Sequence, residues 1–125
     1  MKPEIKKLWS DALNSGNYRQ GKGQLLKGGE FCCLGVLCDV YIRQTNLAEW
    51  LPSQPVTGRH MIIDKDALAG DYITSVLPES VRQWAGGLSY DPLILYKGES
   101  LPLSQLNDAF GLDFKQIAQL IEDQL

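Results

Sequence analysis

The chain has 125 residues, the length of one ordinary domain. Hydrophobic residues make up 44% of it, which excludes a disordered chain, and no apolar stretch reaches the roughly 20 residues of a membrane helix. The net charge of -3 argues against nucleic acid as a partner, because nucleic-acid-binding proteins need an extended basic surface.

The N-terminal segment predicts an amphipathic helix over residues 3–14. Its apolar residues recur at the spacing of one helical face: Ile5, Leu8, Trp9, Ala12 and Leu13. Pro3 suits the first helical turn, where its missing N–H costs nothing. Charged residues interrupt this segment, whereas a secretory signal needs a continuous apolar block, so we expect a cytoplasmic protein with no membrane partner.

Residues 18–24 form a basic, glycine-bearing loop. Glycines can expose backbone N–H groups, and Arg19 with Lys22 adds positive charge, so this loop is the best candidate for binding an anion. The phosphate-loop pattern is not matched, because Gly23 follows Lys22, and turn geometry alone also explains the glycines. The residues that we expect to contact a ligand or partner here are Tyr18, Arg19, Gln20 and Lys22.

Two short apolar runs follow, separated by Gly28 and Gly29, and predict a small hairpin. Lys27, beside this turn, completes the one basic cluster of the sequence. That cluster has enough charge for one or two phosphates, and too little to follow a nucleic-acid duplex.

All three cysteines lie in the apolar run of residues 31–40. This run predicts a helix from Cys33 to about residue 44 that is apolar nearly all round and therefore buried. A buried strand through residue 40 is the alternative that periodicity does not exclude. Within the helix, Gly35 would permit close approach of a neighbouring backbone. An odd number of cysteines, two of them adjacent, argues for reduced thiols rather than a disulfide framework.

The cysteines allow two interpretations. Cys32 or Cys33 at a helix N-terminus would have a lowered thiol pKa and, with His60 as base and Asn107 or Asp108 orienting its ring, would suit a cysteine-dependent hydrolase or transferase. The favoured interpretation is that they are small core residues, because free cysteine is among the most buried residue types. The cysteine spacing does not match zinc sites, so we expect neither a metal nor a cofactor.

Residues 45–75 are the least regular part and read as an insertion or a long surface loop. Within them, residues 59–63 predict a short strand, and residues 64–70 about one helical turn. Trp50 is the aromatic residue that we expect to be exposed at a partner surface.

The C-terminal part alternates short elements. Residues 77–86 predict a short helix with Pro at its start and Gly at its end, and residues 93–101 predict a second hairpin around a Lys-Gly turn. Ser104 is expected to cap a one-turn helix through Asp108. Asp113 begins the last helix, with Gln116 three residues on in a capping-box arrangement.

Asn107 and Asp108 also allow two interpretations. Short polar side chains of this kind often bond to nearby backbone groups and lock a helix–helix corner. The functional alternative is that they line a polar cleft together with the Arg19 loop.

Several of these segments resemble a family of small, functionally uncharacterised proteins of phages, prophages and some bacteria. Members share a Gln-Gly turn, a Cys-Leu-Gly helix start and a Leu-Asn-Asp segment before a C-terminal amphipathic helix. The resemblance is carried by Trp9, Tyr18 to Gly21, Phe31 to Asp39, Leu77, Pro78, Trp84, Leu106, Asn107, Asp108 and Phe114 to Glu122. It implies a genomic setting and no particular activity, with host takeover or counter-defence as typical roles and the host cell cytoplasm as the location.

We therefore expect one α+β domain over residues 1–125, in which a central Cys-rich helix packs against the N- and C-terminal helices beside two short hairpins. The favoured function is a non-enzymatic binding module that acts on a host protein or a small anionic ligand. The alternative is the cysteine hydrolase or transferase that uses Cys32 or Cys33 with His60.

Overall fold

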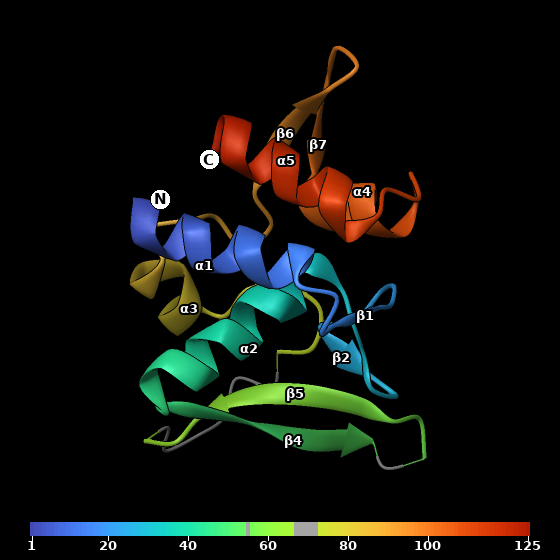
Figure 1. Ribbon diagram of the computed structural model, residues 1–125. Helices are drawn as coiled ribbons and strands as arrows, with labels where there is room; N and C mark the ends of the chain where they lie inside the picture. The colour runs from blue at the N-terminus through green and yellow to red at the C-terminus, as the bar shows by residue number, and fades with distance from the viewer. Residues whose placement is uncertain (55, 67–72) are drawn as a thin grey trace.

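The computed structural model describes residues 1–54, 56–66 and 73–125 (Figure 1). The helices are α1 (Pro3–Asn14), α2 (Cys33–Thr45), α3 (Glu79–Trp84), α4 (Leu103–Asp108) and α5 (Phe114–Gln124). The strands are β1 (Arg19–Gln20), β2 (Leu26–Lys27), β3 (Glu30–Phe31), β4 (Ala48–Gln54), β5 (Arg59–Asp64), β6 (Leu93–Tyr96) and β7 (Glu99–Pro102). The expected α+β fold is confirmed.

Helix α2 is the centre of the core, as its sequence predicts. Its residues from Cys33 to Tyr41 are all buried, so the helix is covered on every side by its neighbours. Helix α1 lies between α2 and α5, and the β4–β5 pair lies on the opposite side of α2 (Figure 1). The C-terminal helix thus reaches the core by packing on α1 and α4.

Local signals explain where α2 begins and ends. The Cys32 side chain caps the helix by accepting a hydrogen bond from the Gly35 N–H at 3.4 Å. Asn46 ends it in the left-handed conformation, with φ of 55°. The segment before β2 lies directly against the first turn, and a Cβ atom placed on Gly35 would lie 1.9 Å from the Leu25 carbonyl oxygen. Glycine is therefore required there for close approach.

The main sheet has five strands in the order β1-β3-β2-β5-β4. The predicted hairpin of β2 and β3 is confirmed, with Gly28 and Gly29 both at positive φ as a tight two-residue turn requires. The described residues of the segment 45–75 are more regular than the sequence suggested, because β4 pairs with β5 over almost its whole length. Strand β5 was predicted, and β4 was not. Of the helical turn expected over residues 64–70, residues 67–70 lie outside the described residues.

The C-terminal elements follow the prediction with one correction. The hairpin of β6 and β7 and the capping box of α5 are both confirmed. Ser104 does not cap α4, however, since the helix begins at Leu103 and its N-cap residue is Pro102. Instead, the Asp91 side chain, which lies earlier in the sequence, accepts hydrogen bonds from the Ser104 N–H at 3.0 Å and from the Ser104 hydroxyl. Among the described residues, every helix is too short or too polar to span a bilayer.

Candidate functional site

The cysteines are packing residues. Cys33 and Cys38 are completely buried, and Cys32 is 3% exposed. The Trp9 indole N–H donates to the Cys33 carbonyl oxygen at 3.0 Å, which ties α1 to the start of α2. Burial raises the pKa of the Cys32 thiol to about 11, so loss of water outweighs the effect of the helix N-terminus that the sequence suggested.

Among the described residues, the cysteine, histidine and asparagine side chains that the hydrolase or transferase alternative requires are not hydrogen-bonded to one another. His60 lies in β5 opposite Leu26, and its Nδ1 is 2.9 Å from the Gly58 carbonyl oxygen. Asn107 contacts the backbone N–H of Cys33 rather than an imidazole. The described residues also contain no group of three His, Cys, Asp or Glu side chains that could hold a metal ion. This arrangement does not supply an activated nucleophile with a base.

We expect iodoacetamide to label the three cysteines only after denaturation. A thiol pKa of about 11 leaves about a hundredfold less thiolate than the usual value near 9, and Cys33 and Cys38 are closed to solvent. The measurement is intact mass against time, with a denatured sample as control. Rapid labelling of one thiol in the native protein would contradict this expectation and favour the hydrolase or transferase alternative.

Asn107 joins three segments that are far apart in the sequence. Its Oδ1 accepts from Gln20 Nε2 at 2.9 Å and from the Cys33 N–H at 3.3 Å. Its Nδ2 donates to the Gly21 carbonyl oxygen and to Asp108 Oδ1, both at 2.8 Å. Asn107 is 1% exposed, so its hydrogen bonds to Gln20 and Asp108 hold this corner together, while Gln20 also lines a hollow beside the Arg19 loop.

Strand pairing gathers cations on one face of the main sheet. Arg19 pairs with Glu30, Glu30 with Lys27, and Lys27 with Arg59, which places the four residues in one row across β1, β3, β2 and β5. Paired residues on adjacent strands share a face of the sheet. We call Arg19, Lys27 and Arg59 the basic row, and with Glu30 among them the net charge of the four side chains is +2.

A hollow of about 510 Å³ adjoins the basic row and holds Lys22. Gly21 and Gly28 contribute backbone to its wall, and Lys27 and Glu30 border both the hollow and the row. Arg59 carries a buried Nε atom that has no hydrogen-bond partner among the described residues. The predicted loop residues Arg19 and Lys22 thus lie beside further cations, which is the setting that an anionic partner needs.

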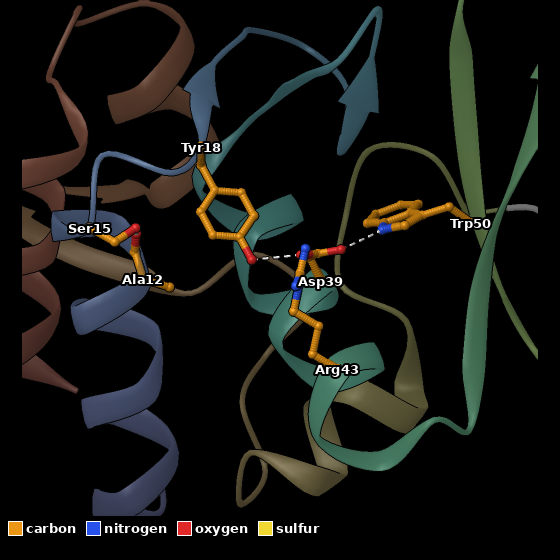
Figure 2. Close-up of polar contacts among 6 residues, drawn as sticks. All are labelled: Ala12, Ser15, Tyr18, Asp39, Arg43 and Trp50. Atoms are coloured by element: carbon orange, nitrogen blue, oxygen red, sulfur yellow. Dashed lines mark hydrogen bonds and ion pairs between the residues drawn. The ribbon is translucent and has the colours of Figure 1, made fainter.

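Tyr18 and Trp50 lie at another site, around the buried carboxylate of Asp39. Figure 2 shows both side chains pointing toward Asp39 from opposite sides. Tyr18 donates its hydroxyl to Asp39 Oδ2 at 2.6 Å, Arg43 donates Nε to the same oxygen at 2.8 Å, and Trp50 donates Nε1 to Oδ1 at 3.1 Å. Trp50 is therefore half-buried and held inward, and the expectation that it is exposed is wrong.

The Asp39 carboxylate raises the pKa values of two neighbouring side chains. Burial and the hydrogen bond to Asp39 raise the pKa of Tyr18 to about 12, and the same carboxylate raises the pKa of Arg43. The cluster borders a groove of about 560 Å³ between α1 and α2. We call it the α1–α2 groove, and its lining includes Leu8, Ala12, Tyr18, Asp39, Val40 and Arg43.

Sequence reasoning missed Asp39, Arg43 and Arg59. One signal could have indicated the first: Asp39 is the single acidic residue in the apolar run of residues 31–40, and a buried charge requires partners. Arg43 follows it by one helical turn, at the spacing of an ion pair. Nothing local marks Arg59, because it joins the row only through pairing of β2 with β5.

No curated protein and no solved structure matches the chain. The model of one family, described as Domain of unknown function (DUF8296), matches residues 1–125. The chain therefore belongs, over its whole length, to this family of unknown function.

Proposed function

We propose that this protein is a non-enzymatic binding module whose basic row holds an acidic segment of a partner protein. The observation that carries the proposal is the alignment of Arg19, Lys27 and Arg59 by strand register, in a chain whose net charge is -3. Cations concentrated on one face of an otherwise acidic molecule steer association toward an anionic surface.

The width of the row favours an extended partner over a single small anion. Arg19 and Arg59 are three strand positions apart, and strands are spaced by about 4.8 Å, so the row extends over about 14 Å. One phosphate or carboxylate contacts only one or two of these cations, whereas successive acidic side chains of a peptide can contact them all. Lys22, in the adjoining hollow, adds a further cation for the same segment.

The resemblance to phage and prophage proteins supports a bacterial host protein as the partner. A protein of this kind would act in host takeover or counter-defence, in the host cell cytoplasm. The chemistry of the row does not depend on that setting, so the two parts of the proposal are tested separately.

We expect the double variant Arg19→Glu, Lys27→Glu to bind a fluorescently labelled oligoglutamate peptide at least about tenfold more weakly, because two favourable charges become repulsive. The readout is anisotropy at low salt. The control is Lys97→Glu, Lys115→Glu, which changes the net charge equally and leaves the row intact. The proposal is wrong if both double variants lose the same affinity, or if the wild-type protein does not bind the peptide.

The host partner is tested by capture from a bacterial lysate followed by mass spectrometry. Wild-type protein and the Lys97, Lys115 control should retain the same host protein, and the Arg19, Lys27 variant should not. Retention by all three would show that any such partner uses another surface.

A further inference from the structure

We propose that the α1–α2 groove is a second, separate binding site, which takes a small amphipathic carboxylate. The carboxylate is bound by the guanidinium group of Arg43, and the apolar body of the ligand lies against the helix walls. Because the site shares no cation with the basic row, this proposal can be tested independently of the proposed partner binding.

The orientation of Arg43 is the first argument. Its Nε donates to Asp39, and Asp39 is itself held by Tyr18 and Trp50, so the guanidinium group is tethered at one edge. The Arg43 side chain is nevertheless 73% exposed, while that of Asp39 is 11% exposed. Its hydrogen-bonding neighbours are Asp39, through Nε, and Tyr18, so several of its five N–H donors remain for an external acceptor. A pre-oriented fork binds a carboxylate in a bidentate manner at a reduced entropic cost.

The walls of the groove supply the second argument. Leu8 and Ala12 of α1 face Val40 of α2 across a volume of about 560 Å³, which lies in the usual range for small-molecule sites. Figure 2 shows Ala12 and Ser15 at the α1 side of this space, across from the Asp39 cluster. A ligand with an apolar body can therefore bury it while its charged end reaches Arg43.

The charges of the groove decide between a carboxylate and a phosphate. Asp11 also lines the groove and is paired with Lys7 at 3.1 Å, and Asp39 is paired with Arg43. Two carboxylates in one groove repel a doubly charged phosphate more strongly than a singly charged carboxylate. The chemistry thus favours an organic acid with one negative charge.

The test is titration of the isotopically labelled protein with phenylacetate and with its neutral counterpart phenylacetamide, followed by NMR. The indole N–H signal of Trp50 reports on the site because it donates to Asp39. Trp9, buried and bonded to the Cys33 carbonyl oxygen, is the internal control. We expect phenylacetate to shift the Trp50 signal in a saturable manner, to leave that of Trp9 unchanged, and to bind at least about tenfold more tightly than the amide.

Variants of Arg43 distinguish bidentate binding by its guanidinium group from attraction by its positive charge alone. Arg43→Gln should reduce the affinity for phenylacetate to that for phenylacetamide, and Arg43→Lys, which keeps the charge beside Asp39, should bind with intermediate affinity. Arg82→Gln in α3 is the control, and neither it nor the Arg19, Lys27 double variant should change the titration. Equal binding of the two probes, or a Trp50 signal that stays fixed up to the solubility limit of phenylacetate, would overturn the proposal.

Discussion

Replacing Gly35 with alanine is expected to lower the free energy of unfolding by about 3 kcal/mol or more, near the upper end of overpacking effects. The added Cβ atom would lie 1.9 Å from the Leu25 carbonyl oxygen and 2.7 Å from its carbonyl carbon. Both are backbone atoms, so no side-chain rotation relieves the clash. Alanine is the better helix former by about 1 kcal/mol, which is smaller than the cost of moving α2 away from the segment that leads into β2.

Urea unfolding of the variant measures this effect, and Gly98→Ala is the matched control. Gly98 has φ of 83°, and a Cβ atom there would have no neighbour within 4 Å, so its substitution imposes backbone strain without a clash. We expect the control to cost about 1–2 kcal/mol. A Gly35→Ala protein as stable as the control would show that α2 and Leu25 separate at little cost.

The helices could be predicted from the sequence because their signals are local. The apolar periodicity and Pro3 predict α1 over the residues that form it, and Asp113 with Gln116 predicts the start of α5. Strand β4 was missed for a different reason. It lies at the edge of the sheet and contains Pro52, which reads as a chain break, and its pairing is specified by β5 rather than by its own residues.

The candidate sites were predictable only in part, because both depend on long-range pairing. Arg19, Lys22 and Lys27 are close in sequence and were recognised as a basic cluster. Arg59 joins them through the β2–β5 register, which no local pattern specifies. Trp50 lies in the least regular part of the sequence, which favours exposure at a partner surface. Its inward orientation follows from the hydrogen bond to Asp39 in the preceding helix, α2.

The hydrogen bonds of Asn107 connect the three motifs that carry the resemblance. The Gln-Gly turn, the Cys-Leu-Gly helix start and the Leu-Asn-Asp segment are three separate motifs in the sequence, and Asn107, which belongs to the third, bonds to the other two. These motifs therefore account for the packing of α2 and α4 against the turn after β1.

Replacing Asn107 with alanine is accordingly expected to lower the free energy of unfolding by about 3–5 kcal/mol. The substitution leaves the Cys33 N–H and the Gly21 carbonyl oxygen without the side chain that now bonds to them, and Gln20 keeps only its bond to the Leu112 carbonyl oxygen. Each buried polar group left unsatisfied costs about 1–3 kcal/mol. Urea unfolding gives the total, and amide hydrogen exchange at Cys33 tests the cause directly.

Two further variants distinguish lost hydrogen bonds from lost packing. Asn107→Asp preserves the shape and the acceptor for Gln20 and Cys33 but removes the donor to Gly21, and it places a second carboxylate beside Asp108. It should therefore be destabilised almost as strongly as the alanine variant. Asn17→Ala, at an exposed position, should change stability by less than about 0.5 kcal/mol. If Asn107→Asp were as stable as the wild-type protein, the bond to Gly21 would contribute nothing, and the corner would be held by apolar packing alone.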